Sequence, residues 1–61
     1  MSVTKLKIER EKQGLTQEQV AKEAEVTVKG YQRYEYGERL PRVDTAILIA
    51  KALNSTVEEL F

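Results

Sequence analysis

Apolar residues recur along the chain with a helical period, and single turn-forming positions interrupt the pattern. The stretches between these interruptions carry apolar side chains three or four residues apart, which is typical of helices that bury one face. No stretch shows the strict alternation of a half-buried strand. The pattern predicts an all-α fold, a compact domain of five helices over residues 4–61, with breaks at Gly14, the region of Glu25, Gly37 to Pro41, and Asn54.

The first predicted helix runs from about Thr4 to Gln13. Gly14 follows at the place where helices commonly end with a left-handed residue. The apolar stripe of this helix is thin and includes Val3 and Leu6.

Two short helices separated by a tight turn are predicted over residues 16–36. Thr16 opens the first of them, and Gln19 three residues later completes a capping-box pattern. Thr27 can cap the second, which reaches about Tyr36. Small residues let the two helices approach closely, and the expected inward face of the first consists of Val20, Ala21 and Ala24.

A fourth helix is predicted over residues 43–53, with an apolar stripe at positions 43, 47, 50 and 53. Asn54 can end it in a left-handed conformation. Thr56 and Glu59 form a second capping-box pattern that opens a last turn. Two apolar residues, Ile8 and Leu48, fall outside the inward stripes of their helices and are interpreted as scattered surface residues. The alternatives are burial under the last turn for Ile8, or an exposed apolar spot that contacts a partner.

Two charged residues stand where the helical pattern expects apolar ones. Arg10 lies on the stripe of Leu6, and Glu35 lies one turn after Tyr31, so both side chains point inward. Buried charges are tolerated when they are paired. We therefore predict an ion pair between Arg10 and Glu35 that joins the first helix to the end of the third. The alternative is two long side chains that reach solvent separately.

The composition excludes several classes of function. The chain has no cysteine and no histidine. A disulfide framework, a thiolate zinc site and catalysis by a nucleophile with histidine are therefore excluded, and we expect no metal and no cofactor. No apolar run approaches the 18 or more residues of a membrane span, and no signal peptide is recognisable. The expected location is the cytoplasm.

The charges cancel in sum but are sorted along the chain. Ten Lys and Arg residues balance ten Asp and Glu residues, so bulk basicity does not mark a nucleic-acid binder. Residues 27–43 carry two carboxylates against four cations, whereas the final residues include Glu58 and Glu59. One face could therefore be basic, or these could be ordinary solvated helix surfaces. The four cations are Lys29, Arg33, Arg39 and Arg42.

A distinctive set of residues extends over most of the chain. It consists of Gly14-Leu15-Thr16-Gln17, Ala21, Val26-Thr27, Tyr31, Arg33, Glu35, Gly37, Pro41, Ile49-Ala50-Lys51-Ala52-Leu53 and Val57-Glu58-Glu59-Leu60-Phe61. With these residues, from about Leu6 to Phe61, the chain resembles the Cro and phage-repressor type of helix-turn-helix protein, often called XRE-like. The resemblance combines spacing, caps and the inward pair of charges, so it does not depend on one short motif.

This resemblance implies a domain that binds operator DNA as a dimer, with the third helix in the major groove. Gln17 would hold a phosphate and brace the third helix, Tyr36 could offer its hydroxyl to a phosphate, and Arg42 would lie near the minor groove. Arg39 joins the candidates through its place in the basic segment. The positions expected to read base edges or nearby backbone are Thr27, Val28, Lys29, Gln32 and Arg33.

Three positions depart from the family pattern. Glu25 stands at a turn where relatives usually have Gly, and a left-handed backbone there would be strained. Gly30 lies inside the third helix, where Gly weakens helical structure. Arg42 stands where a capping Ser often begins the fourth helix, and Asp44 in the first turn can partly compensate through the helix dipole.

The leading hypothesis is a sequence-specific, DNA-binding transcriptional regulator without enzymatic activity, in the simplest case a repressor. It would act as a homodimer through the last turn, with Val57, Leu60 and Phe61. The alternative is a helical protein-interaction module that recognises a toxin, an antirepressor or another subunit, which the zero net charge favours slightly. An enzyme has little support, because the chain lacks the length to form a cleft.

Overall fold

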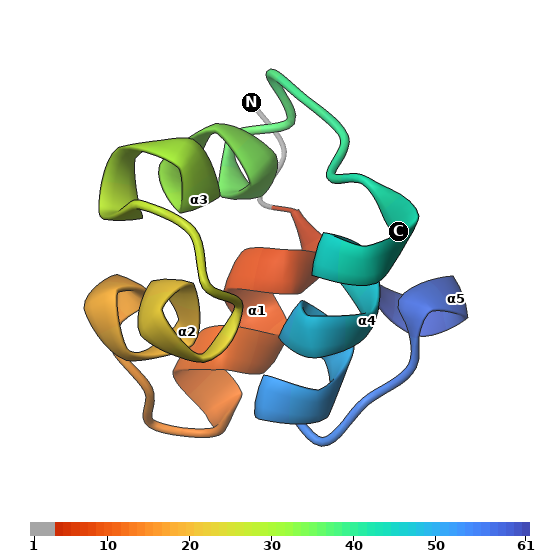
Figure 1. The fold of residues 1–61 in the computed structure, drawn as a ribbon. Coiled ribbons are helices and arrows are strands. Elements are labelled where there is room, and N and C mark those ends of the chain that lie inside the picture. Colours follow the sequence, from red (N-terminus) through yellow and green to blue (C-terminus); the bar gives the residue numbers. More distant parts are fainter. Residues whose placement is uncertain (1–3) are drawn as a thin grey trace.

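A computed structural model describes residues 4–61, which form five α-helices and no strand. Figure 1 shows α2 and α3 at one side of the molecule, with α4 and α5 at the other. The all-α fold with five helices is therefore confirmed, while Val3 lies outside the described residues. The helices are α1 (Lys5–Lys12), α2 (Gln17–Glu23), α3 (Val28–Glu35), α4 (Val43–Ala52) and α5 (Val57–Leu60).

Threonine hydroxyls cap four of the five helices. Thr4, Thr16, Thr27 and Thr56 each accept a hydrogen bond from the backbone N–H three residues later. Such a cap satisfies one of the N–H groups that a helix leaves free at its start. At Thr16 the capping box is complete, as predicted. At Thr56 only the hydroxyl of the predicted box takes part, because no bond returns from the side chain of Glu59.

The helix ends predicted from Gly and Asn are confirmed by left-handed backbone at those positions. The φ angles are 73° at Gly14, 74° at Gly37 and 53° at Asn54. Glu25 also has a positive φ, 61°, at the turn between α2 and α3. A side chain in this conformation is disfavoured relative to Gly. The strain suspected at Glu25 from the family comparison is thus present in the backbone.

The core lies where all five helices meet. Val20 and Ala21 of α2 are almost fully buried, and Tyr31 of α3 is fully buried against them. Because Ala21 is 1% exposed in tight surroundings, its small side chain permits the close approach of α2 to its neighbours. The buried cluster comprises Leu6, Val20, Ala21, Ala24, Tyr31, Ile49, Ala50, Leu53 and Leu60.

The buried face of α4 differs from the prediction. Val43 is 78% exposed and Ile47 is 43% exposed, although both were expected to point inward. The face that packs runs through Ala46, Ile49, Ala50 and Leu53. Leu48 is partly buried against the core, so its interpretation as a scattered surface residue was wrong. Because α4 is apolar on several sides, its own period does not decide which side packs; its contacts with α2 and α5 do. Ile8 is exposed, as expected for a scattered surface residue.

Candidate nucleic-acid interface

A short turn through Glu25 joins α2 to α3 and leaves α3 on the outside of the molecule (Figure 1). α3 has eight residues, which corresponds to about 12 Å of helix. Its inward side carries the buried residues Tyr31 and Glu35. These two side chains anchor α3 to the core, so that its opposite side faces solvent.

The outward side of α3 presents the residues that the sequence singled out. Lys29 and Arg33 are exposed and lie one helical turn apart, and neither takes part in an ion pair within residues 4–61. Gln32 is partly buried between this face and α2. The predicted exposure of Lys29 and Arg33 is therefore observed. The remaining candidates on or beside α3 that are exposed are Thr27, Val28 and Tyr36.

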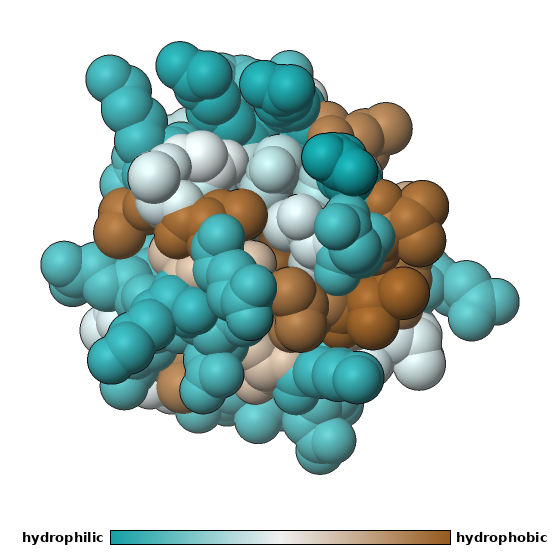
Figure 2. Space-filling model, viewed as in Figure 1, coloured by the Kyte–Doolittle hydropathy of each residue, from teal (hydrophilic) through white to brown (hydrophobic). Residues whose placement is uncertain are grey.

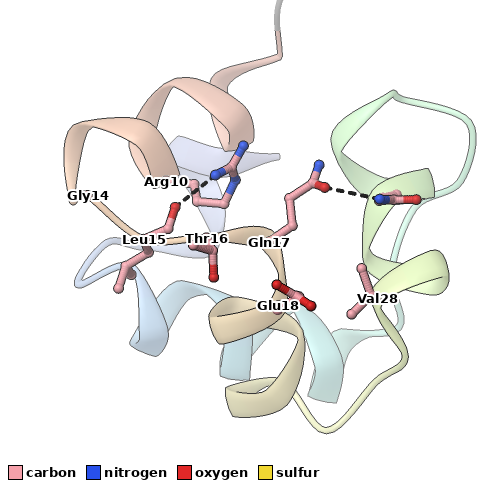
Figure 3. A pocket seen from close by; sticks show the side chains of 8 residues that line it. Arg10, Gly14, Leu15, Thr16, Gln17, Glu18 and Val28 are labelled. Carbon is pink, nitrogen blue, oxygen red and sulfur yellow. Dashed lines mark hydrogen bonds between the residues drawn. The ribbon is translucent and has the colours of Figure 1, made fainter.

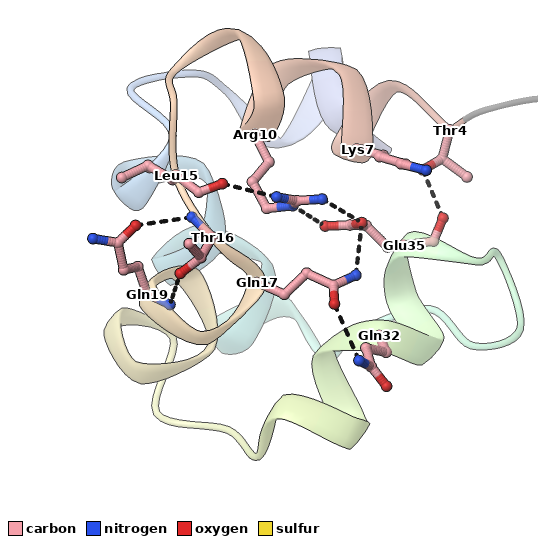
Figure 4. A network of polar contacts seen from close by, with 9 residues as sticks. All are labelled: Thr4, Lys7, Arg10, Leu15, Thr16, Gln17, Gln19, Gln32 and Glu35. Carbon is pink, nitrogen blue, oxygen red and sulfur yellow. Dashed lines mark hydrogen bonds and ion pairs between the residues drawn. The ribbon is translucent and has the colours of Figure 1, made fainter.

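A buried ion pair fixes the far end of α3 to α1. Nε of Arg10 donates to Oε2 of Glu35 at 2.6 Å, and Nη2 of Arg10 donates to Oε1 of Glu35 at 3.3 Å. The side chain of Arg10 is 11% exposed and that of Glu35 is fully buried. Arg10 also donates to the backbone carbonyl of Leu15 at 2.8 Å, and Thr4 donates to the carbonyl of Glu35 at 2.7 Å. The predicted pair between Arg10 and Glu35 is confirmed (Figure 4).

The surroundings of this pair keep both partners charged. Burial alone would raise the pKa of Glu35, but the hydrogen bonds from Arg10 and Gln17 and the positive charge of Arg10 outweigh it, so that the pKa is lowered. The hydrogen bond to Glu35 raises the pKa of Arg10. Burial, together with the adjacent carboxylate, raises the pKa of Tyr31, whose hydroxyl has no hydrogen-bond partner among the described residues.

Gln17, at the first position of α2, links this pair to the outward side of α3. Its Nε2 donates to Oε1 of Glu35 at 3.1 Å, and its Oε1 accepts from Nε2 of Gln32 at 3.0 Å. Figure 4 shows the three side chains in one row. The brace predicted for Gln17 is present in the structure. Sequence reasoning did not foresee that Gln32 is its partner, because an amide side chain gives no periodic signal.

A shallow hollow separates the start of α2 from α3 (Figure 3). Thr16, Gln17 and Glu18 line it from α2, and Val28 and Gln32 line it from α3. The hollow lies beside the exposed face of α3, and Glu18 adds a negative charge there.

Two more candidate cations lie on the segment between α3 and α4. Arg39 and Arg42 are both exposed. Nε of Arg42 lies 3.8 Å from Oδ1 of Asp44, but the two side chains are 88% and 73% exposed, so the contact constrains Arg42 little. Arg42 occupies the N-cap position of α4 without a side-chain cap, as expected, and Oδ1 of Asp44 accepts instead from the N–H of Thr45.

The residues expected to form a dimer surface are divided between core and surface. Leu60 is 5% exposed and belongs to the core, so it is not available to a partner, whereas Phe61 is 42% exposed and Val57 is partly buried. Sequence reasoning missed an apolar surface beside them, where Leu40 and Val43 are exposed (Figure 2). This apolar surface consists of Leu40, Pro41, Val43, Ala46, Val57 and Phe61.

Within residues 4–61, no helix is long and apolar enough to cross a membrane. The described residues also contain no group of three or more acidic side chains placed to hold a metal ion.

Two short helices joined by a tight turn, α2 and α3, are the arrangement of a helix-turn-helix protein. Here a buried ion pair holds the second helix in place. The family model for helix-turn-helix proteins matches residues 6–60. The chain belongs to this family, in its Cro and phage-repressor, or XRE-like, branch. No curated protein sequence matches the chain significantly.

The chain is also similar to solved structures. ComR from S. thermophilus, in complex with DNA and its signalling peptide ComS, is 40% identical over 93% of this chain, with a TM-score of 0.82. This chain spans 20% of the length of that ComR chain. The restriction-modification controller protein C.AhdI from Aeromonas hydrophila is 28% identical, with a TM-score of 0.84, and the match covers 93% of this chain and 86% of C.AhdI.

Proposed function

We propose that this protein is a sequence-specific, DNA-binding transcription regulator without enzymatic activity, whose effect as a repressor comes from occupying operator DNA. The observation that carries this proposal is the bare outward face of α3, where Lys29 and Arg33 are exposed and lack ion-pair partners within the described residues. Support comes from the family and from the two neighbours, of which one is a controller protein and the other is in complex with DNA.

The proposed contacts follow from the chemistry of each group. Lys29 and Arg33 donate to O6 and N7 of guanine, and the methyl groups of Val28 contact a thymine methyl. The remaining free hydrogen on Nε2 of Gln17 is directed to a phosphate at the start of α2. The other proposed DNA contacts are made by Thr27, Gln32, Tyr36, Arg39 and Arg42.

The salt dependence of DNA binding tests this function against a protein-interaction module. Each phosphate that the protein neutralises releases counterions, so the affinity of a DNA binder falls steeply as salt rises. We expect the affinity for a selected site, measured by fluorescence anisotropy, to fall at least tenfold between 50 and 200 mM salt, the loss that roughly two phosphate contacts produce. Affinity that is absent or independent of salt contradicts the proposal.

We further propose that two copies bind a two-fold symmetric operator through the apolar surface defined above, including Val57 and Phe61 of the last turn. Arg39 and Arg42 neighbour the loop residues of this surface along the chain, and Glu58 and Glu59 lie between Val57 and Phe61. A two-fold axis that sets the last turn of one copy against the loop of the other would bring these opposite charges together. All four of these side chains are exposed. Two copies would place two α3 helices about 34 Å apart, one turn of DNA.

The dimer is tested with Leu40→Glu, which puts a carboxylate on the apolar surface without touching α3. Leu40 is 79% exposed, so its replacement leaves the core unchanged. We expect the variant to sediment as a monomer and to lose cooperative binding to DNA that carries two half-sites, while it keeps its affinity for one half-site. Glu38→Gln is the control on the same loop. Unchanged cooperativity in Leu40→Glu contradicts this dimer surface.

A further inference from the structure

A row of hydrogen bonds runs from a buried carboxylate to the outer side of α3. Arg10 holds Glu35 from one side, and Gln17 donates to Glu35 from the other at 3.1 Å. Gln32 then donates to Gln17 at 3.0 Å. Figure 4 shows the amide nitrogen of Gln32 turned toward Gln17 and its oxygen turned away.

The charge at the buried end gives each hydrogen bond in this row its direction. An ionised carboxylate can only accept hydrogen bonds. Gln17 must therefore turn its NH₂ group to Glu35, which leaves its oxygen facing α3. Gln32 must in turn direct its own NH₂ group to that oxygen. With a protonated Glu35, which can donate, both amides could rotate together by half a turn and still form both hydrogen bonds.

This direction determines what Gln32 offers to a ligand. The only hydrogen bond that its side chain makes within residues 4–61 is the one to Gln17, so its side-chain oxygen is unpaired. Gln32 lies on α3 one turn after the exposed Val28 and next to the exposed Arg33. In the major groove, N6 of adenine and N4 of cytosine are donors, whereas O6 of guanine and O4 of thymine are acceptors. An outward oxygen can pair only with the first two.

We propose that Gln17 is a positioning residue that, together with Glu35, holds the amide of Gln32 with its oxygen outward, and that Gln32 thereby selects adenine or cytosine at one position of each half-site. This inference rests on the proposed function, because it requires α3 to lie in a major groove. It adds a selectivity for the two bases that present an amino group in the major groove, adenine and cytosine. This selectivity arises from Gln17 and Glu35, which lie behind the contact.

The first test uses the free protein and needs no DNA. Gln17→Met keeps the length of the side chain but removes its donor and acceptor, and it leaves Arg10 and Glu35 in contact. In ¹⁵N spectra of the side-chain amides, we expect the Gln32 NH₂ protons to exchange with solvent several times more slowly than those of Gln13, which is exposed. This protection should disappear in Gln17→Met. Equal exchange at Gln32 and Gln13 in the parent overturns the proposal.

The second test measures base preference with DNA duplexes that differ at one position. We expect Gln32→Ala to reduce the preference for adenine or cytosine at a single position by about fivefold, as for one lost hydrogen bond. Gln17→Met should reduce the preference at the same position by the same factor, and the double variant should show no further loss. Gln13→Met is the matched control and should bind as the parent does.

The outcomes separate this inference from the function on which it rests. If the parent selects a site but Gln17→Met keeps the full preference at the Gln32 position, the inference is overturned and the proposed function stands. If the parent binds all sequences equally, both are overturned. A general loss of affinity in Gln17→Met without a change in base preference shows only a phosphate contact at Gln17 and also overturns the inference. Melting temperatures of all variants confirm that each is folded.

Discussion

At the scale of single residues, the carboxylate of Glu35 joins three helices. It accepts hydrogen bonds from Arg10 of α1 and Gln17 of α2, while its backbone belongs to α3. A buried charge of this kind is stable only while its partners remain, because neither charge is solvated by water. The placement of α3 therefore depends on the buried pair of Arg10 and Glu35 behind its exposed face.

Glu35→Ala should destabilise the protein severely. The substitution leaves Arg10 largely buried without a partner, which costs on the order of 3 to 5 kcal/mol. A domain of this size has roughly that much stability in total. We expect a melting curve shifted far down or lost, measured by circular dichroism. Glu38→Ala, in the exposed loop after α3, should melt as the parent does, and an unchanged curve for Glu35→Ala rules out an energetic role for the pair.

The lowered pKa of Glu35 predicts a loss of stability in acid. The ordinary pKa of this group is 4.5, and folding lowers it. Above 4.5 the group therefore contributes its full stabilisation, and this contribution is lost as pH falls through the lowered value. Melting temperatures between pH 7 and pH 2 should show this decline in the parent. Glu35→Gln should show a smaller decline, and parallel curves for the two proteins contradict the assignment.

The sequence was sufficient to predict the ion pair between Arg10 and Glu35, but not the hydrogen bond between the side-chain amides of Gln17 and Gln32. Arg10 and Glu35 interrupt apolar stripes, so their position alone shows that they need partners. Gln17 and Gln32 lie at polar positions where a solvated side chain is equally consistent with the pattern. Their contact depends on the crossing of α2 and α3, which the sequence does not specify at the level of single hydrogen bonds.

At the scale of elements, the helix ends were predictable because they depend on local chemistry. Threonine caps and left-handed Gly and Asn residues act through neighbouring backbone, and the caps at Thr16, Thr27 and Thr56 appear where the sequence placed them. The cap that Thr4 forms was not predicted. The buried face of α4 was predicted wrongly. That helix is apolar on several sides, so its partners decide which side packs, and Val43 and Ile47 remain exposed.

Glu25→Gly should stabilise the turn between α2 and α3. Glu25 has a φ of 61°, where a side chain costs about 1 kcal/mol relative to Gly. For a domain of this length such a gain raises the melting temperature by roughly 4 to 8 °C. Asn54→Gly at φ 53° is the matched control and should gain less, because Asn tolerates this conformation. A lower melting temperature for Glu25→Gly contradicts the strain.

Arg42→Ser should raise stability and weaken DNA binding at the same time. The N-cap of α4 has no side-chain hydrogen bond, and a Ser hydroxyl there should contribute about 1 kcal/mol. Loss of the cation should lower the affinity for DNA. It should also reduce the slope of log affinity against log salt concentration by about 1, the value of one phosphate contact. Arg42→Ala separates the two effects, because it should weaken binding without the gain in melting temperature. Unchanged binding by both variants removes Arg42 from the interface.

At the scale of the whole molecule, a neutral chain can still present a basic face. The ten cations and ten carboxylates cancel. Within residues 4–61, however, Lys29, Arg33 and Arg39 have no ion-pair partner on α3 and the following loop, while Glu58 and Glu59 lie on α5. The sum of charges suggested a protein-interaction module, and their distribution in space favours DNA. The apolar surface beside α5 was not predictable, because it combines a loop residue, the start of α4 and the last turn.

The central claim is that α3 reads DNA, and selection of bound sequences from random DNA tests it most directly. The parent, Lys29→Ala, Arg33→Ala and, as a control on α4, Lys51→Ala are compared in parallel. We expect each of the first two variants to relax the preference at one or two positions of each half-site, at a cost of about 1 to 3 kcal/mol per lost contact. Lys51→Ala should select the parental site. If Lys29→Ala and Arg33→Ala also select the parental site with parental affinity, α3 is not the reading element.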